Sequence, residues 1–232
     1  MIVMQLQDKV VLITGSSTGI GKETAIALAK AGCRVVITYH NTKKEGEAVW
    51  KECSKYTPAL LLHLDVTYEK SIQEGVAKIR EKFGQIDVLI NNSGLFMYKR
   101  LEKQTAAEIR AQINVNLIGA IHMTQACLSQ LVLRPEAVIV NVASALSKEP
   151  IANATTYCAS KYGLRGFTQA LALELPQNVR VYCVNPGLTA TKMTGFQGIG
   201  AGQVADVIVA SVQERLGKKS GEDVDVKDFV PK

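Results

Sequence analysis

Short apolar runs rich in β-branched residues alternate with segments of helical periodicity along the chain. In the helical segments the apolar residues recur three or four positions apart, which is typical of a helix that packs one face on a sheet. The apolar runs contain few polar residues, which indicates strands buried on both faces, as in parallel sheets. The pattern predicts an α/β fold of the doubly wound class, with a mainly parallel sheet of about seven strands and helices on both faces.

The predicted elements alternate from one end of the chain to the other. Strands are expected at residues 9–14, 34–39, 59–66, 86–94, 137–144, 179–187 and 222–226. Helices are expected at residues 19–32, 42–56, 69–84, 106–133, 155–175 and 203–217. No Ser/Pro-rich linker and no internal repeat separates them, so residues 1–232 are expected to form a single domain. Ligands of such folds bind at the carboxyl ends of the strands.

Composition narrows the range of partners. The net charge of +6 suits a phosphate-bearing ligand, but no concentrated basic stripe of the kind that binds nucleic acid is present. The five cysteines form no CxxC pair and the three histidines lie far apart, so we expect no metal site. No apolar run reaches the ~18 residues of a membrane span. The N-terminus does not have the pattern of a signal peptide, so we expect a cytoplasmic protein with no membrane partner.

The stretch TGSSTGIG, residues 14–21, lies between the first predicted strand and the first predicted helix. Gly15 allows a tight turn, Gly19 allows close approach to a pyrophosphate, and Gly21 allows close helix–strand packing. The helix N-terminus offers free N–H groups to an anion. An ordinary turn is the alternative, but the flanking strand and helix favour nucleotide binding. The residues assigned to this contact are Gly15, Ser17, Thr18, Gly19, Ile20 and Gly21.

Several motifs occur in order along nearly the whole chain. They are the glycine loop, NNSG at 91–94, Ser144, YCASK at 157–161 and NPG at 185–187. Together they resemble the short-chain dehydrogenase/reductase family in its short single-domain form. The resemblance implies one dinucleotide-binding domain of the Rossmann type and hydride transfer between a nicotinamide cofactor and a small carbonyl or alcohol substrate. A short, glycine-rich segment at about 192–202 is expected to form the substrate loop.

The end of the second predicted strand bears on the choice of cofactor. An acidic side chain there would hydrogen-bond the ribose hydroxyls and repel a 2′-phosphate. This chain has Tyr39, His40 and Asn41 at that place, followed closely by two lysines. The sequence therefore favours NADP(H) as cofactor. NAD(H) stays possible, because Thr18 stands where NADP-selective members of the family often have an arginine.

The resemblance assigns further cofactor contacts at the ends of the later strands. Asp65 and Val66 are expected to contact the adenine. Asn92 is expected to lie near the adenosine ribose, with Gly94 close by. Pro186 and Gly187 are expected to turn the chain over the nicotinamide, and Thr191 to anchor its carboxamide. Two residues have a competing or additional structural interpretation. Asp65 suits a helix N-cap, and Asn91 is expected to tie neighbouring strands together.

Tyr157 and Lys161 lie one helical turn apart, on the same face of a predicted helix. A tyrosine can protonate a carbonyl oxygen, but its pKa near 10 would have to fall by three units, which requires about 4 kcal/mol. The Lys161 ammonium supplies part of this stabilisation and also reaches the nicotinamide ribose. Ser144 is expected to hold the substrate oxygen. Asn116 is expected to bend its helix and hold a water that links Lys161 to solvent, although each of these four residues also suits a purely structural role.

The substrate itself is left open by the sequence. The expected pocket is mildly apolar and compatible with ketones, quinones, sugars or acyl thioesters, with Leu95, Phe96, Leu146, Met193 and Phe196 as candidate lining residues. Alternative functions are a cofactor-binding redox sensor, a 3-oxoacyl carrier-protein reductase and a purely structural protein. The resemblance also implies assembly into a homodimer or homotetramer through the two long helices at 106–133 and 155–175.

Overall fold

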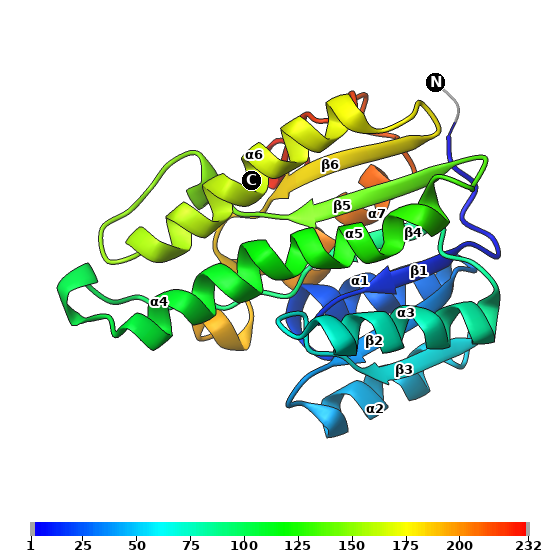
Figure 1. The fold of residues 1–232 in the computed structure, drawn as a ribbon, viewed down its shortest axis with the longest axis horizontal. Coiled ribbons are helices and arrows are strands. Elements are labelled where there is room, and N and C mark those ends of the chain that lie inside the picture. Colours follow the sequence, from blue (N-terminus) through cyan, green and yellow to red (C-terminus); the bar gives the residue numbers. More distant parts are fainter. Residues whose placement is uncertain (1–2, 231–232) are drawn as a thin grey trace.

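The computed structural model describes residues 3–230 and confirms the Rossmann-type α/β architecture (Figure 1). The central sheet has seven strands in the order β3-β2-β1-β4-β5-β6-β9, and every neighbouring pair is parallel. The strands are β1 (Val10–Ile13), β2 (Arg34–Tyr39), β3 (Ala59–His63), β4 (Val88–Asn91), β5 (Ala137–Val142), β6 (Val179–Asn185) and β9 (Asp223–Asp225).

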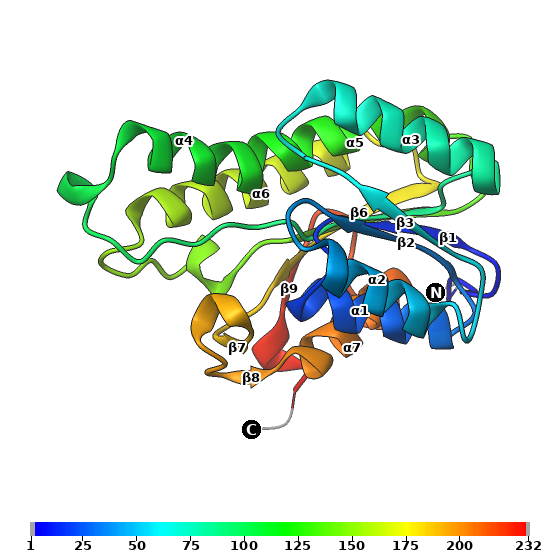
Figure 2. The ribbon, with the colours of Figure 1, turned by 90° about the horizontal axis from the view of Figure 1, so that it is seen from below.

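Helices cover both faces of this sheet, which gives three layers (Figure 2). One face carries α1 (Gly19–Lys30), α2 (Lys43–Cys53) and α7 (Ala201–Val212). The other carries α3 (Glu69–Phe83), α4 (Ala106–Ile113), α5 (Gly119–Leu131) and α6 (Thr155–Glu174).

The apolar runs of the sequence become strands that are buried on both sides. In β1, Val11 and Ile13 belong to the core under α1, α2 and α7, whereas Val10 and Leu12 belong to the core under α3, α5 and α6. All four side chains are fully buried. A strand in the middle of such a sheet needs apolar residues at every position, which explains why these segments do not alternate between apolar and polar residues.

The connections reverse direction between β1 and β4. From β1 the chain continues outward to β2 and β3, then returns to place β4 on the other side of β1 and continues to β5 and β6. The crossovers on the two sides of this point leave a crevice at the carboxyl ends of β1 and β4. In open parallel sheets this is where ligands bind.

The helix expected at 106–133 is interrupted by a π-helical segment, η2 (Asn114–Ile118), between α4 and α5. The Gly119 N–H donates to the Asn114 carbonyl, five residues back instead of four. A π-bulge changes the direction of side chains within a helix and often occurs at functional sites. The helix expected at 203–217 ends at Val212, because Glu214 adopts a left-handed φ of 59°.

The segment at about 192–202 is more structured than a simple loop. It contains a short 3₁₀ turn, η4 (Lys192–Thr194), and the strand β8 (Ile199–Gly200), which pairs with β7 (Thr189–Ala190). A Cβ atom on Gly198 would lie 2.0 Å from the Leu188 carbonyl oxygen, and Gly198 has a φ of +102°. The chain folds back on itself so tightly there that only glycine fits.

Residues 3–230 contain neither a membrane-spanning helix nor a cluster of metal ligands. None of their helices combines the length and the apolar character needed to cross a membrane. No three of their His, Cys, Asp or Glu side chains group as metal ligands would. All five cysteines are buried and free, so no disulfide stabilises the fold.

Candidate active site

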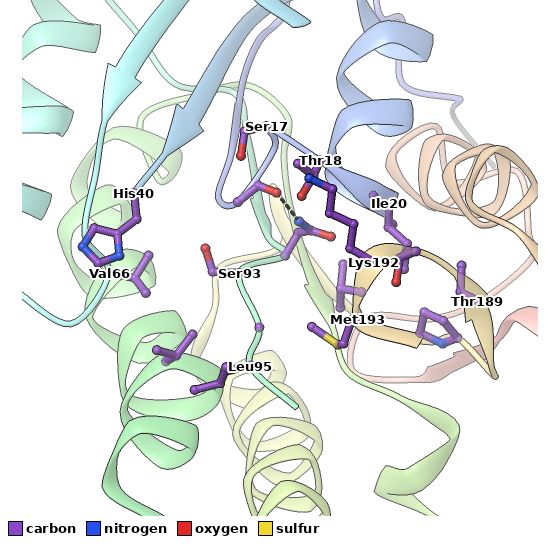
Figure 3. A pocket seen from close by; sticks show the side chains of 18 of the residues that line it. Ser17, Thr18, Ile20, His40, Val66, Ser93, Leu95, Thr189, Lys192 and Met193 are labelled. Atoms are coloured by element: carbon purple, nitrogen blue, oxygen red, sulfur yellow. Dashed lines mark hydrogen bonds between the residues drawn. The ribbon is translucent and has the colours of Figure 1, made fainter. Parts of the chain in front are cut away.

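A cavity of about 580 Å³ opens at the carboxyl edge of the sheet, at the crevice between β1 and β4 (Figure 3). Figure 3 shows Ser17, Thr18 and Ile20 of the glycine loop on one wall, and His40, Val66 and Leu95 on the other. The segment after β6 supplies a third side. Residues from eight separate parts of the chain therefore face one cavity.

The glycine loop forms the wall at the end of β1. Gly15 and Gly19 have left-handed φ values of 63° and 57°, which glycine adopts without strain. A Cβ on Gly21 would lie 2.7 Å from the Gly15 carbonyl oxygen, so Gly21 serves packing and does not line the cavity. Thr18 precedes α1, and its side chain makes no capping hydrogen bond. The first N–H groups of α1 are therefore left without a side-chain cap, as an anion site requires.

The carboxyl ends of β2 and β3 form the far end of the cavity. Tyr39, His40 and Asn41 line it, as predicted. His40 Nε2 lies 3.5 Å from Asp65 Oδ2. Asp65 Oδ1 also accepts hydrogen bonds from the N–H and hydroxyl of Thr67, at 2.9 Å and 2.7 Å, and the pKa of Asp65 is lowered because these bonds outweigh its burial. Asp65 therefore lines the cavity, but the helix N-cap that its sequence suggested is wrong, because Tyr68 precedes α3 and Asp65 closes a turn with Thr67 instead.

The residues after β4 connect the cavity to the core. Asn91 is buried, and its Nδ2 donates to Asn141 Oδ1 on β5 over 2.8 Å and to Thr124 Oγ1 on α5 over 3.0 Å. The expectation that Asn91 ties neighbouring strands together is confirmed. Asn92 lines the cavity, and its Nδ2 donates to the Thr14 carbonyl over 2.9 Å, so it also fixes the glycine loop.

Ser144, Tyr157 and Lys161 reach the same cavity from two elements. Ser144 follows β5, and its hydroxyl accepts a hydrogen bond from the Leu146 N–H over 3.1 Å at the start of a 3₁₀ turn, η3 (Ala145–Ser147). Tyr157 and Lys161 lie on α6, and Lys161 Nζ is 5.7 Å from the centre of the Tyr157 ring. Three groups that are spread over 17 positions of the chain therefore reach the same cavity.

The protein surroundings shift both titratable groups. Burial raises the pKa of Tyr157 to about 12, although the facing Ser144 hydroxyl works in the opposite direction. Burial lowers the pKa of Lys161 to about 8. Lys161 is 4% exposed, and its Nζ donates to the Val142 carbonyl over 2.8 Å. A buried ammonium so close to a phenol favours the phenolate, but desolvation of the phenol outweighs this in the protein alone.

Asn116 is buried in the π-helical segment and does not line the cavity. Its Oδ1 accepts from the Leu95 N–H over 2.7 Å, and its Nδ2 donates to the Leu95 carbonyl over 2.9 Å and to Ser160 Oγ over 3.0 Å. A Cβ on Gly94 would lie 3.7 Å from Asn116 Oδ1 and 3.9 Å from Lys161 Nζ. The amide is engaged with protein groups, and the water link to Lys161 stays a prediction.

The segment after β6 lies beside the glycine loop, since a Cβ on Gly19 would be only 3.2 Å from Thr191 Cγ2. Pro186, Gly187 and Thr191 line the cavity, as predicted, together with Met193. Thr189 is buried, and its hydroxyl donates to the Gly187 carbonyl over 2.9 Å, so this threonine stabilises the turn after β6. Among the predicted pocket residues, Leu95 and Met193 line the cavity, whereas Leu146, Phe96 and Phe196 do not.

Phe96 nevertheless contacts the site. Its ring packs edge-on against the ring of Tyr157, with centroids 4.8 Å apart and an interplanar angle of 80°. Phe196 is 69% exposed at the surface of the segment after β6. Of these two predicted pocket residues, one therefore packs against the phenol and the other is exposed away from the cavity lining.

Some cavity residues were not identified from the sequence. They are Thr42, Leu64, Ser93, Val115, Val142, Ala143, Lys192 and Thr194. Most of them are direct neighbours of predicted residues, which periodicity cannot distinguish. Lys192 is different, because its Nζ lies 3.4 Å from Glu45 Oε1 on α2, across the cavity mouth. The sequence signal that could have identified Lys192 as a cavity residue was its place directly after Thr191 in a glycine-rich segment.

Comparisons with known proteins agree with this geometry. A family model described as short chain dehydrogenase matches residues 9–199. An uncharacterized oxidoreductase of Staphylococcus saprophyticus is 34% identical over 205 residues, which cover 88% of each chain. The 3-oxoacyl-[acyl-carrier-protein] reductase FabG of Thermotoga maritima is 37% identical over 198 residues, which cover 82% of this chain and 78% of that one. The crystal structure of a short chain dehydrogenase from Burkholderia cenocepacia in complex with NADP superposes with a TM-score of 0.88 at 32% identity, covering 96% and 97% of the two chains.

Replacing Lys161 by Met should raise the free energy of unfolding at pH 7 by about 1–2 kcal/mol in the absence of ligand. Burial lowers the pKa of Lys161 from 10.5 to about 8, which costs at most about 3 kcal/mol. The lost hydrogen bond to Val142 offsets about 1 kcal/mol of this gain. Between pH 8 and 10.5 the unfolded chain binds more protons, so the penalty is full below pH 8 and fades toward pH 10.5.

Denaturant titrations of the two proteins at pH 7 and pH 10 measure this difference. The variant should be the more stable protein at pH 7, and its advantage should shrink at pH 10. An equal advantage at both pH values, or a less stable variant at pH 7, would show that the ammonium is not destabilised by burial.

Proposed function

The chain belongs to the short-chain dehydrogenase family, and from this premise we propose that it is an NADP(H)-dependent oxidoreductase that interconverts a carbonyl and a secondary alcohol, with Tyr157 as general acid and base. Family membership makes it an enzyme that acts on CH–OH groups with NAD(P). The observation that carries the finer proposal is the convergence of Ser144, Tyr157 and Lys161 on the cavity that the glycine loop also lines.

The cavity fits a nicotinamide dinucleotide on its own chemistry. The uncapped N-terminus of α1 and the glycine backbone around Gly15 and Gly19 suit a diphosphate. In this proposal Tyr39, His40 and Asn41 contact the adenosine ribose, and Asp65 and Val66 contact the adenine. Asn92 lies near the adenosine ribose with Gly94 close by. Pro186 and Gly187 turn the chain over the nicotinamide, and Thr191 anchors its carboxamide. The bound cofactor supplies or accepts the hydride.

The protein groups have complementary roles around the substrate oxygen. The Ser144 hydroxyl holds the carbonyl oxygen, and the Tyr157 phenol donates its proton to that oxygen as negative charge develops there. In the oxidative direction the phenolate accepts the proton back. Lys161, with a pKa of about 8, is mostly charged at pH 7, and its ammonium stabilises the phenolate. Lys161 also binds the nicotinamide ribose in this proposal.

A preference for NADP(H) is supported by the end of β2. None of the three residues at the end of β2, Tyr39, His40 and Asn41, carries a carboxylate. Lys192 adds a cation at the cavity mouth. The structural relative from Burkholderia cenocepacia was crystallised with NADP. Both observations favour a site that accepts a 2′-phosphate.

A 3-oxoacyl carrier-protein reductase is the second candidate, because a relative with that name is 37% identical over most of its length. Both candidates share the chemistry at Ser144 and Tyr157 and differ only in the substrate. A panel of simple ketones, quinones and an acetoacetyl thioester, followed by NADPH absorbance, separates them. Turnover confined to the thioester would favour the second candidate.

Assembly into a homodimer or homotetramer through α4, α5 and α6 also belongs to the proposal. Leu133 after α5 and Leu173 on α6 are 77% and 90% exposed, which is unusual for large aliphatic side chains and fits a surface that is covered in an oligomer. Sedimentation equilibrium tests this, and a purely monomeric chain at micromolar concentration would contradict it.

Replacing Tyr157 by Phe should reduce turnover of any substrate of the panel by at least about 1,000-fold, because the proton donor is lost. The affinity for NADPH, measured by cofactor fluorescence, should change less than about threefold. Turnover of the variant at the parent rate would disprove the acid assignment. NADPH binding without turnover by the parent protein would instead favour a redox sensor.

NADPH should be used with a kcat/KM at least about tenfold above that for NADH. Replacing Tyr39 by Asp should reverse this preference, since a carboxylate at the end of β2 repels the 2′-phosphate and binds the ribose hydroxyls. Tyr39→Phe is the matched control and should keep the preference for NADPH. Equal kcat/KM values for the two cofactors in the parent protein would contradict this interpretation of β2.

A further inference from the structure

The loop that carries Ser144 is attached to the end of strand β6. The Ala145 N–H donates to the Pro186 carbonyl over 2.8 Å. The Ser147 hydroxyl donates to Asn185 Oδ1 over 3.0 Å, and both of these side chains are buried. The position of the Ser144 hydroxyl therefore depends on where Asn185 and Pro186 lie.

Two carboxylates of strand β9 fix the orientation of the Asn185 side chain. Its Nδ2 donates to Asp223 Oδ1 over 3.3 Å and to Asp225 Oδ1 over 3.1 Å. Ionised carboxylates only accept hydrogen bonds, so the NH₂ end of Asn185 must face β9 and its oxygen must face Ser147. Asp223 and Asp225 thereby determine which atom Asn185 offers to the loop.

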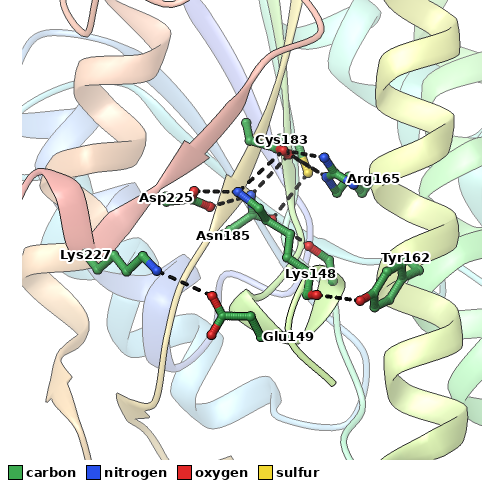
Figure 4. Close-up of polar contacts among 10 residues, drawn as sticks. Lys148, Glu149, Tyr162, Arg165, Cys183, Asn185, Asp225 and Lys227 are labelled. Atoms are coloured by element: carbon green, nitrogen blue, oxygen red, sulfur yellow. Dashed lines mark hydrogen bonds and ion pairs between the residues drawn. The ribbon is translucent and has the colours of Figure 1, made fainter. Parts of the chain in front are cut away.

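The same carboxylates bind helix α6 and the far end of the loop (Figure 4). Arg165 Nε donates to Asp223 Oδ2 over 2.8 Å, and Lys148 Nζ donates to Asp225 Oδ2 over 2.7 Å. The Tyr162 hydroxyl on α6 donates to the Lys148 carbonyl over 2.6 Å. Figure 4 shows this cluster lying between α6, the loop after β5, and the strands β6 and β9.

Arg165 connects the cluster to the reactive part of α6. Tyr157, Lys161 and Arg165 follow one another at intervals of four residues, so they share one side of the helix. Asp223 holds the third of these residues while the other two reach the cavity. The cluster therefore joins the loop of Ser144 to the helix of Tyr157 and Lys161 from outside the cavity.

Asp223 and Asp225 are largely buried, so the loss of either negative charge would disturb the contacts around it. The side chains of Asp223 and Asp225 are 15% and 19% exposed. Burial acts to raise the pKa of Asp223, but hydrogen bonds from Arg165 and Asn185 outweigh it and lower this pKa. Breaking a partly buried ion pair by removing one partner leaves the other charge uncompensated. Neutral Asp223 would leave Arg165 unpaired and would release the constraint on Asn185.

We propose that Asp223 and Asp225 are positioning residues that hold the Ser144 hydroxyl in register with Tyr157 and Lys161, acting through Asn185, Lys148 and Arg165. The inference rests on the proposed function, because it assigns these residues to the same reaction. It extends the site to a strand that does not line the cavity. A shift of about 1 Å in a catalytic group costs about 100-fold in rate, so a small displacement of the loop is sufficient to matter.

A different ion pair, which involves a residue of β6, provides a matched control. Arg180, near the start of β6, donates through Nε to Glu214 Oε1 over 2.8 Å. These side chains are 19% and 14% exposed, close to the 29% and 15% of the Arg165–Asp223 pair. Asp223 binds Asn185 at the carboxyl end of β6, next to the loop of Ser144, whereas Glu214 binds Arg180 near the start of the same strand.

The experiment compares Asp223→Asn with Glu214→Gln in the full chain. Asp223→Asn should lower kcat about 10- to 100-fold with less than a threefold change in NADPH affinity, and peptides covering residues 143–148 should exchange backbone hydrogens faster. Glu214→Gln should lower the melting temperature by a similar amount, but with kcat within twofold of the parent and unchanged exchange at 143–148. Adding Arg165→Gln to Asp223→Asn should restore part of kcat, because the two neutral side chains hydrogen-bond each other.

The proposal is overturned if Asp223→Asn keeps kcat within twofold and leaves exchange at 143–148 unchanged, or if Glu214→Gln loses kcat equally. Asp225→Asn provides the same comparison if Asp223→Asn fails to fold, and it should also accelerate exchange at 143–148. The exchange measurement does not need substrate. If the parent protein shows no turnover, the proposed function fails, while faster exchange confined to the Asp223 and Asp225 variants still supports the positioning network.

Discussion

The parallel direction of the strands is the constraint on which this site depends. Because β1, β4, β5 and β6 all run the same way, their carboxyl ends meet at one edge of the sheet. The glycine loop, Asn92, Ser144 and Pro186 each follow one of these strands, and so they line one cavity although they lie far apart in the sequence. Tyr157 and Lys161 come from helix α6, which packs beside β5 and β6. Chemistry at this edge is therefore a consequence of the topology.

The buried ammonium of Lys161 lowers the free energy of unfolding of the protein but serves the chemistry of the site. Desolvation lowers its pKa, and one backbone carbonyl, that of Val142, is its hydrogen-bond acceptor among the described residues. An apolar residue would pack there at lower cost. A lysine at position 161 is explained by the stabilisation that its positive charge gives to the phenolate of the neighbouring Tyr157. Burial raises the pKa of that phenol to about 12. The two desolvation effects oppose the state that reaction requires, so further positive charge close to the phenol is needed to complete the site.

The sequence predicted the sheet, the order of its elements and most of the cavity, because β-branched runs and glycine spacing are local signals. Gly15, Gly19, Ser144, Tyr157 and Lys161 all lie where the motifs indicated. It predicted that Asn116 bends its helix but not the π-helical form of that segment, since a bulge depends on tertiary contacts such as those with the Leu95 backbone and Ser160. It also did not reveal Lys192 pairing with Glu45, or the carboxylates of β9 behind Ser144, because long-range ion pairs leave no periodic pattern.

The proposed substrate side of the cavity and its cofactor side differ in how strongly they can distinguish one ligand from another. The cofactor side is lined by backbone groups and polar side chains held in fixed hydrogen bonds, such as Asn92 on the glycine loop. The proposed substrate side includes Met193, which lines the cavity with 47% of its surface exposed, and Phe96 packs behind Tyr157. An open apolar surface distinguishes substrates by only about 1–3 kcal/mol per methylene group, whereas unpaired buried polar groups reject far more strongly. Selectivity should therefore be strict for the cofactor and broad for the carbonyl compound.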